Sequence, residues 1–163
     1  MTSAQTHLTL ALATEQDLDD LFTMVEALSD FLGETHEFFG SKESLGQHGF
    51  GEQRLFQALI ARNAGSPVGL SLFYPEYSSW RGQAGVYILD LYVDSAFRGT
   101  GLGRQLVKET LATANQQWQA QYIRLAVHTH NAKAAAFYQQ LGFSRCEDDL
   151  IMIIGHDQLP KSH

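Results

Sequence analysis

The chain has 163 residues, 44% of them hydrophobic, so it is long enough to bury a substantial core as a single domain, residues 1–163. Its formal net charge of -7 argues against a general nucleic-acid surface or an anionic-membrane surface and is compatible with a cationic partner. One cysteine, Cys146, cannot form an internal disulfide, and neither an N-terminal signal nor an apolar run of membrane length stands in the sequence. We therefore expect a cytoplasmic protein, with Cys146 as a small core residue.

The first part of the chain predicts a strand followed by a long helix. Residues 8–13 alternate enough for a strand, and Thr14 with Asp17 has the spacing of a helix capping box. Gly33 is placed to end the helix. The apolar residues that recur at helical spacing before it are Leu18, Leu21, Phe22, Val25, Leu28 and Leu32.

The middle of the chain predicts a polar segment and then a hairpin. Residues 34–51 are polar, with Ser41 placed to cap a short helix, and form either a mobile segment over a site or an ordinary surface connection. Residues 55–62 and 68–74 are predicted strands, because glycine and proline separate the two apolar runs. A loop containing Trp80 then leads to a third strand.

Residues 86–104 combine a strand, a glycine-rich turn and the start of a helix. The turn contains three alternating glycines, which allow left-handed dihedrals and the close approach of a ligand. Successive N–H groups at a helix N-terminus form an anion site, to which Arg98 adds a positive charge. Arg104 replaces the last glycine of a dinucleotide fingerprint, and the G-K-[ST] of a Walker loop is missing. The turn is either a phosphate site of another kind or a turn without a ligand.

The last part of the chain predicts further alternation of helices and strands. Asn131 is placed to cap a helix and Gly142 to end it. The complete order of elements predicts an α/β (α+β) fold with a mixed, mostly antiparallel central sheet and helices on both faces. The remaining predicted elements are a helix at 102–118, a strand at 122–128, a helix at about 132–141, and a closing hairpin of 143–146 with 149–154.

Two motifs, together with this order of elements, resemble the GNAT superfamily of N-acetyltransferases. The first motif is Y-I-L-D-L-Y-V-D-S-A-F-R-G-T-G-L-G at residues 87–103, and the second is H-T-H-N-A-K-A-A-A-F-Y-Q-Q-L-G-F at residues 128–143. The resemblance implies a GNAT-type fold and an acetyl-CoA-dependent enzyme. Acetyl-CoA would be the co-substrate.

A narrower resemblance covers nearly the whole chain. G-F-G-E at 49–52 and Y-S-S-W-R-G at 77–82 are similar to the diamine/spermidine (and thialysine) acetyltransferase branch. That branch carries acidic contacts for an amine where this chain has Leu89 and Leu32, which puts polyamine specificity in doubt. Members of the branch are homodimers, so the I-M-I-I run at 151–154 is either a pairing surface or a buried core strand.

The resemblance also implies roles for individual residues. The turn would hold the CoA pyrophosphate, the strand edge before it would hydrogen-bond the pantetheine arm, and Asn131 would help to position CoA. Tyr138 would be the general acid that protonates the departing thiolate, whereas by residue type alone it is a half-buried aromatic on an amphipathic helix. The cofactor-binding residues expected on this basis are Leu91, Tyr92, Val93, Arg98, Gly99, Thr100, Gly101, Leu102, Gly103 and Asn131.

The acceptor side of the site lacks an obvious base. A lysine-type amine has a pKa near 10.4, so its deprotonation at pH 7 costs roughly 4–5 kcal/mol. Because Leu89 cannot take the proton, Asp90 is the expected catalytic and substrate-binding carboxylate, its alternative being a paired strand aspartate. Glu34 and Trp80 are expected in the acceptor pocket; otherwise Glu34 is solvated, with His36 and Glu37, and Trp80 covers the sheet edge.

The two histidines at 128 and 130 face the same way if the strand continues to them. A metal pair is conceivable, but no third ligand has a convincing spacing, so we expect no metal. A local polar or water-relay role fits His128 and His130 better.

The expected function is therefore transfer of an acetyl group from acetyl-CoA to a primary amine of a small acceptor, by direct attack. The acceptor would be a diamine, a polyamine or an amino-acid-like molecule. One alternative is a catalytically weak acyl-CoA-binding sensor or interaction domain, and another is a protein-lysine acetyltransferase. The expected partners are the small amine and a second copy of the chain, with no nucleic acid and no membrane.

Overall fold

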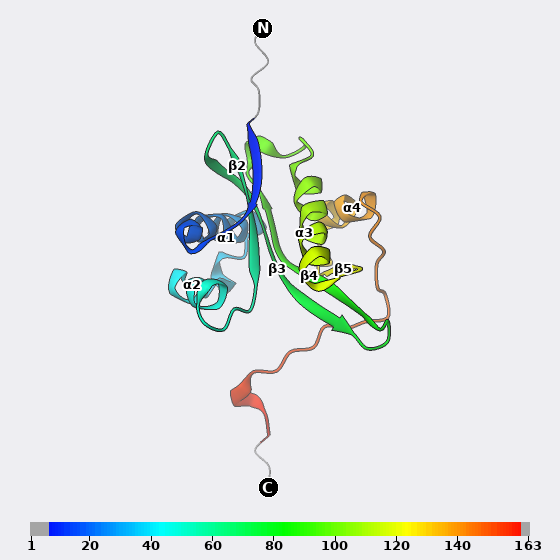
Figure 1. Ribbon diagram of the computed structural model, residues 1–163. Coiled ribbons are helices and arrows are strands. Elements are labelled where there is room, and N and C mark those ends of the chain that lie inside the picture. The colour runs from blue at the N-terminus through cyan, green and yellow to red at the C-terminus, as the bar shows by residue number, and fades with distance from the viewer. Residues whose placement is uncertain (1–6, 161–163) are drawn as a thin grey trace. The chain divides into compact units, whose positions relative to one another are not determined.

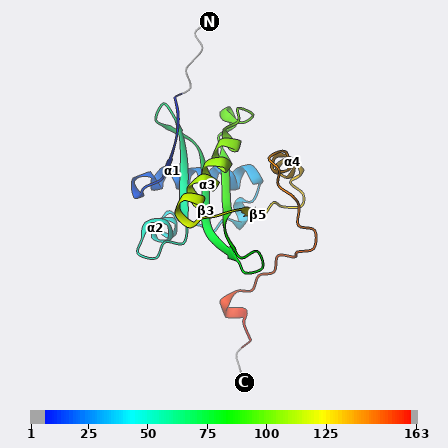
Figure 2. The same cartoon turned by 45° about the vertical axis from the view of Figure 1, so that its right-hand side comes forward.

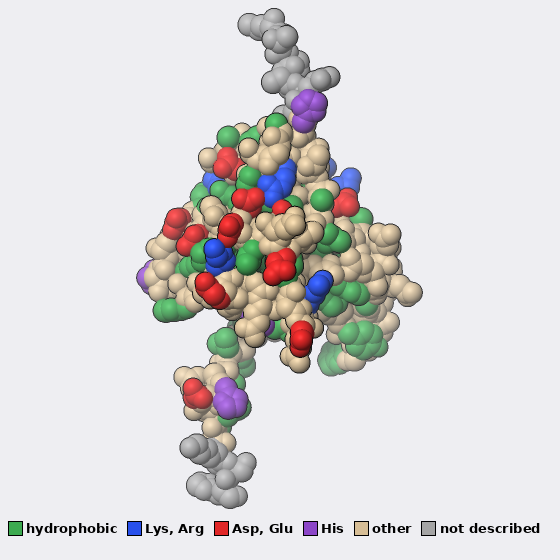
Figure 3. Space-filling model, turned by 60° about the vertical axis from the view of Figure 1, so that its left-hand side comes forward, with side chains coloured by type: hydrophobic (Ala, Val, Ile, Leu, Met, Phe, Trp, Pro, Cys, Tyr) green, Lys and Arg blue, Asp and Glu red, His purple; other side chains and the backbone are tan. Residues whose placement is uncertain are grey.

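The protein is described by a computed structural model, which covers residues 7–160. The chain forms two compact units, the first ending at Ala126 and the second beginning at Val127. Within the described residues, no helix combines the length and the apolar character needed to cross a membrane. Acidic side chains are spread over the face shown in Figure 3, with basic side chains between them, in keeping with the net charge of -7.

The first unit contains one five-stranded sheet in the order β1-β2-β3-β4-β5. The first four strands pair antiparallel, and β5 pairs parallel to β4 (Figure 1). This confirms the predicted mixed, mostly antiparallel sheet. The strands are β1 (Leu8–Leu12), β2 (Gln57–Asn63), β3 (Ser66–Ser78), β4 (Gln83–Val93) and β5 (Ile123–Leu125).

Helices cover both faces of this sheet, as predicted. The helices α1 (Leu18–Leu32) and α2 (Lys42–Phe50) lie on one side, and α3 (Leu102–Trp118) lies on the other (Figure 1). Figure 2, which brings α3 forward, shows α1 passing behind the sheet. Short 3₁₀ turns stand at Glu15–Asp17, Thr35–Glu37, Ser95–Phe97 and His156–Gln158.

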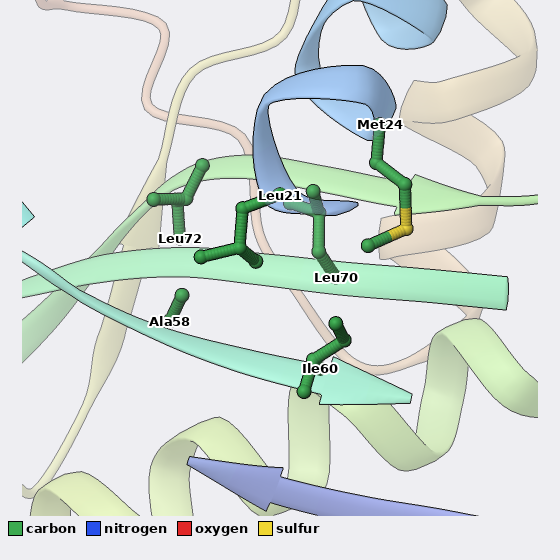
Figure 4. Packing of buried hydrophobic residues seen from close by; sticks show 6 residues of the cluster. All are labelled: Leu21, Met24, Ala58, Ile60, Leu70 and Leu72. Carbon is green, nitrogen blue, oxygen red and sulfur yellow. The ribbon is translucent and has the colours of Figure 1, made fainter. Parts of the chain in front are cut away.

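The face of the sheet toward α1 carries the apolar core. Leu21 and Met24 of α1 point onto the strands (Figure 4) and are almost fully buried. Because side chains alternate along a strand, Leu70 and Leu72 of β3 share this face. The strand side of the cluster consists of Ala58, Ile60, Leu70 and Leu72.

The opposite face of the sheet packs against α3. The intervening β3 residues Ser71 and Phe73 are fully buried there. The hydroxyls of Ser71 and Thr110 are 2.8 Å apart, which satisfies a polar pair inside an apolar contact. The rings of Phe73 and Trp118 lie edge to face, with centroids 6.1 Å apart. The two-residue alternation of β3 thus fixes which helix each side chain meets.

The predicted helix boundaries of the first unit are confirmed. Thr14 and Asp17 form the capping box, in which the Thr14 N–H donates to Asp17 Oδ2 at 2.8 Å. Gly33 ends α1 with φ 71°, a left-handed conformation that glycine adopts without penalty. Ser41 Oγ accepts from the Ser44 N–H at 3.1 Å and so caps α2.

Two strands differ in length from the prediction. β3 continues to Ser78, because its outer half pairs with the first half of β4 in a long hairpin. β5 covers only Ile123–Leu125 of the predicted 122–128, because its pairing with β4 stops at Ile88. At the next residue, Leu89, the register of β4 against β3 shifts.

The second unit contains α4 (Ala132–Gln140). Asn131 Oδ1 accepts from the Ala134 N–H at 3.1 Å, and Gly142 follows the helix with φ 101°, which confirms both predicted boundaries. Most of the second motif, residues 128–143, therefore lies on the capped helix α4.

The predicted closing hairpin is wrong. Residues 143–154 form no strand, and Cys146 is exposed rather than part of a core. The apolar run is exposed too, with Ile151 85% and Ile153 96% accessible, so the buried-strand interpretation is also wrong. An isolated two-stranded hairpin is marginally stable in water, and three consecutive acids at 147–149 lie in the expected turn.

Candidate active site

The outer edge of β4 carries the first part of the site. The Asp94 N–H donates to Val68 O at 2.8 Å. Because hydrogen-bonded pairs alternate in an antiparallel ladder, Leu91 and Val93 direct their N–H and C=O groups away from β3. Since β5 pairs with β4 only at Val86–Ile88, these groups form an open edge. Val93 O accepts from Arg98 Nε, and the remaining groups of the edge can pair with an extended ligand as an added strand.

A β-bulge marks the beginning of this edge. Leu72 is in register with Asp90, but Phe73 is in register with Ile88, so Leu89 is an extra residue in β4. Leu89 is 51% exposed. Asp90 shares the face of Leu72, which is the α1 side of the sheet.

Burial changes the acidity of the Asp90 carboxyl. Its removal from water raises the pKa of Asp90 from 3.8 to about 6, because the charged form is less well solvated. A carboxylate with this pKa is ionised at pH 7 and is a stronger base than an exposed aspartate. Asp90 therefore has the properties of a proton acceptor.

The glycine turn after β4 has the predicted left-handed conformation. Gly99 has φ 76° and Gly101 has φ 91°, and a Cβ added at either position would meet no atom within 4 Å. The backbone conformation, rather than crowding, therefore requires glycine at these positions. Thr100 Oγ1 donates to Phe97 O at 2.6 Å, and this local hydrogen bond stabilises the turn.

The turn leads directly into α3, whose first intrahelical hydrogen bond joins the Gln105 N–H to Gly101 O at 3.1 Å. The N–H groups that precede it, including those of Leu102 and Gly103, have no acceptor within the helix. Together with the helix dipole they form a site for an anion. The open space at both glycines leaves room for a phosphate group.

Arg98 lies between this turn and α1. Its Nε donates to Val93 O at 2.9 Å, and its guanidinium lies 3.9 Å from the ring centroid of Phe31. Phe31 is 55% exposed, so this cation–π contact lies at the surface. Phe31 was not predicted as a site residue from the sequence. The signal that could have indicated it is an aromatic residue near the end of the helix that lies outside the apolar stripe.

The other expected acceptor residues lie apart from Asp90 or at an edge. Trp80 is fully exposed in the turn between β3 and β4. Asp90 stands seven positions after Gln83, the first residue of β4, which corresponds to about 23 Å at ~3.3 Å per residue. Glu34 is half-buried and precedes the Thr35–Glu37 turn. The structure does not bring Trp80 to Asp90.

The second unit holds the remaining expected residues. Tyr138 is half-buried on α4, with its ring 5.0 Å from Phe137 and 5.4 Å from Phe143, centroid to centroid. His128 and His130 are exposed and their rings stack at 5.3 Å. Across residues 7–160, no three His, Cys, Asp or Glu side chains gather as a metal site would require.

Residues 21–143 match the family model described as Acetyltransferase (GNAT) family. The chain belongs to this family. It is an acetyl-CoA-dependent N-acetyltransferase, which confirms the class of enzyme expected from the two motifs. The match begins in α1 and ends just after α4, so it includes every element that carries a site residue.

Similar proteins support the narrower resemblance as well. The thialysine N-epsilon-acetyltransferase of Mus musculus is 36% identical over 138 residues, 80% of this chain and 80% of that protein. The spermine/spermidine N(1)-acetyltransferase of Bacillus subtilis (strain 168) is 26% identical over 81 residues, 48% of this chain and 53% of that protein. An aminoglycoside N-acetyltransferase solved with CoA superposes with a TM-score of 0.76 at 15% identity, covering 96% and 99% of the two chains, which shows the fold.

The residues of this acetyltransferase fit an extended, pyrophosphate-bearing cofactor. The open edge at Leu91 and Val93 runs along the strand toward the glycine turn, and the turn ends at a helix N-terminus. An amide-rich arm can therefore pair with the edge while an anionic group meets the turn. Tyr92 does not contribute to this open edge, because its backbone pairs with Leu70 of β3. Its side chain packs against the core under α1.

Proposed function

We propose that this acetyltransferase transfers the acetyl group to a primary amine of a small acceptor: a diamine, a polyamine or an amino-acid-like molecule. The observation that carries the proposal is the carboxyl of Asp90, which is half-buried, has its pKa raised to about 6 by loss of solvation, and directly precedes the open edge of β4. A base next to the cofactor edge is what an amine acceptor requires.

The cofactor contacts follow the backbone of one continuous segment. The peptide groups of Leu91–Val93 pair with the pantetheine arm, with Tyr92 holding the strand in place. The turn from Arg98 to Gly103, with Thr100 and Leu102 in it, binds the pyrophosphate through its N–H groups. Asn131 helps to position CoA.

The chemistry is a direct displacement at the thioester carbon. The amine nitrogen forms the C–N bond, the C–S bond breaks, and the sulfur leaves with the electron pair as a thiolate. The acceptor attacks as the neutral amine, which has the lone pair. Asp90 accepts the proton that this nitrogen loses, and Tyr138 donates its hydroxyl proton to the thiolate. The products are the acetamide and CoA as a thiol.

Asp90 is not the base that converts the acceptor ammonium to the neutral amine before the attack. Its pKa of about 6 lies well below the ~10.4 of a lysine-type ammonium, so complete transfer in the ground state is unfavourable. The ammonium therefore loses its first proton to solvent, which leaves a small fraction of neutral amine at pH 7. Asp90 takes the second proton as the C–N bond forms and the nitrogen becomes far more acidic. Glu34 is proposed to contact the acceptor from the segment after α1, whereas Trp80 in the β3–β4 turn lies too far from Asp90 to contact the same small acceptor.

Release of free thiol from acetyl-CoA tests this function. Diamines, polyamines, amino acids and lysine peptides are offered in parallel, and acetylated product is identified by mass. We expect turnover with small primary amines. Failure to bind acetyl-CoA at all would end the proposal.

The second candidate function is an acyl-CoA-binding sensor or interaction domain. It is favoured by Leu89, an apolar and half-exposed residue where the similar branch carries an acid. It predicts tight binding of the cofactor without transfer to any amine in the panel. Acetylation of lysine peptides alone would instead identify a protein-lysine acetyltransferase.

We further propose that the enzyme is a cytoplasmic homodimer of one domain, without metal, nucleic acid or membrane partners. The exposed apolar run at 150–154 supports pairing of two chains, because a solvent-exposed run of this kind is characteristic of an interface. Light scattering should give twice the chain mass. Paired changes Ile151→Ser and Ile153→Ser should return the monomer mass, and a monomeric wild type would refute the proposal.

A further inference from the structure

A cluster of two tyrosines and an ion pair spans β3, β4 and β5. Tyr74 is in register with Tyr87, and Tyr87 with Arg124, so their side chains share one face. The tyrosine rings stack at 5.1 Å, and the Arg124 guanidinium carbon lies 5.0 Å from the Tyr87 ring centroid. Nε and Nη2 of Arg124 donate to the Glu76 carboxylate at 2.8–3.1 Å.

This cluster lies on the same face of the sheet as Asp90. Tyr74 stands two residues beyond Leu72 on β3, and Leu72 faces α1 and is in register with Asp90. Two residues of strand span about 7 Å. An extended lysine side chain spans ~6 Å from Cα to its nitrogen, at ~1.5 Å per bond along a zigzag. An amine at Asp90 would thus place the far end of such a molecule over the Tyr74–Tyr87 pair, against which the Arg124 guanidinium also lies.

The two charges of the pair are not equally available to a ligand. The Arg124 side chain is 62% exposed, whereas that of Glu76 is 15% exposed. The carboxylate of Glu76 is occupied in holding the guanidinium, and the cation faces solvent. The group presented beside the tyrosines is therefore positive.

The residue between the two ends is apolar. Leu89, 51% exposed at the bulge, lies on β4 between Tyr87 and Asp90. It suits a methylene stem and offers nothing to a second ammonium. A cation at the far end and a leucine in the middle disfavour a diamine or polyamine, whose distal group is itself positive.

We propose that Arg124, held by Glu76 and Tyr87, binds the carboxylate of a lysine-like amino-acid acceptor whose side-chain amine lies at Asp90. The inference rests on the proposed function and narrows its substrate class. Arg124 is then a specificity-determining residue. A guanidinium fixed in this way matches a carboxylate through paired N–H donors.

The test uses two acceptors that differ only in the carboxylate, lysine and 1,5-diaminopentane. Wild-type enzyme should have the higher kcat/KM for lysine. Arg124→Gln should lower kcat/KM for lysine roughly 10-fold or more, as expected for the loss of a charge-assisted hydrogen bond, and change that for the diamine less than about 2-fold. Arg124→Lys, which keeps the charge, should retain an intermediate preference.

Arg81→Gln is the matched control. Arg81 also lies over a tyrosine, Tyr122, at 5.0 Å, but it stands in the β3–β4 turn away from Asp90. Its substitution should leave the lysine-to-diamine ratio unchanged. This separates a carboxylate contact from a general loss of positive charge.

Three results would overturn the inference. Equal losses with both acceptors in Arg124→Gln would make Arg124 a structural residue that anchors β5. If wild-type enzyme acetylates the diamine at least as well as lysine, the proposed carboxylate contact of Arg124 is refuted, whereas the proposed acetylation of small amines is not. Turnover with neither acceptor, although acetyl-CoA binds, would refute the proposed small-amine function itself.

Discussion

The two halves of the site are built by different means. The proposed cofactor half consists of backbone: the edge groups of Leu91 and Val93, the left-handed glycines and the first N–H groups of α3. The proposed acceptor half consists of side chains, Asp90 above all, with Leu89 on the same strand and Arg124 on β5. A site built from backbone groups tolerates substitution of the side chains around it. A site built from side chains can change its ligand preference when a single residue is substituted. We therefore expect the cofactor half to fix the reaction and the acceptor half to select the acceptor.

The largest effect should come from Tyr138→Phe, which removes one hydroxyl. If Tyr138 protonates the thiolate, kcat should fall roughly 10²-fold or more, while acetyl-CoA affinity stays nearly constant because no cofactor contact is lost. Thiol release and calorimetric binding measure the two quantities. Phe137→Leu on the same helix is the control for packing, and unchanged turnover in Tyr138→Phe would exclude Tyr138 from catalysis.

Asp90→Asn should separate catalysis from stability. The variant cannot accept a proton, so kcat/KM should drop about 10²-fold, and the wild-type profile should rise with pH through about 6 as Asp90 ionises. A wild-type rate that is flat between pH 5 and 7 would argue against this base.

The same substitution should stabilise the fold at alkaline pH. The folded pKa of Asp90 is raised above its unfolded value of 3.8, so ionisation of Asp90 favours the unfolded state. The favourable contribution of the protonated form is present below pH 3.8 and is lost as the pH rises through 6. Asp90→Asn should therefore gain about 1–3 kcal/mol in urea unfolding at pH 8 and little at pH 4. An equal gain at both pH values would contradict the burial of Asp90.

Gly101→Ala tests whether the cofactor half depends on backbone conformation. Alanine at φ 91° costs about 1–2 kcal/mol, so the turn should relax and acetyl-CoA binding should weaken about 10-fold. Gly65→Ala is matched to it, since Gly65 has φ 86° and equally open space but lies in the β2–β3 turn. If both variants bind acetyl-CoA equally well, the turn is not the anion site.

Phe31→Leu should give the smallest effect. It keeps an apolar side chain at the end of α1 but removes the ring under Arg98, so acetyl-CoA affinity should fall only about 2- to 5-fold. Phe39→Leu is the control, because Phe39 is 91% exposed in the following segment. A loss in the control as large as in Phe31→Leu would refute a role for this ring in positioning Arg98.

The cofactor half could be predicted from the sequence because local residue types dictate it. Alternating glycines, the residues that favour strand before them and the helical pattern after them specify a strand, turn and helix without any distant contact. The capping residues Thr14, Ser41 and Asn131 are local signals of the same kind, and all three cap as predicted.

The acceptor half could not be predicted in the same way, because its residues come together only through the register of the paired strands. Nothing in the sequence shows that Leu89 is an extra residue in β4, or that Arg124 and Glu76 meet across three strands. The failed hairpin at 143–154 has a related cause. Its alternating apolar residues are suited to a strand, but a strand requires a partner, and local sequence does not supply one.

Amide hydrogen exchange with and without saturating CoA shows whether β4 and the glycine turn hold the cofactor through the backbone. CoA should slow exchange at Leu91, Val93 and the N–H groups from Gly99 to Gly103, whereas Tyr92, already paired with β3, should change little. Uniform slowing along β4, or no change at Leu91 and Val93, would contradict the account.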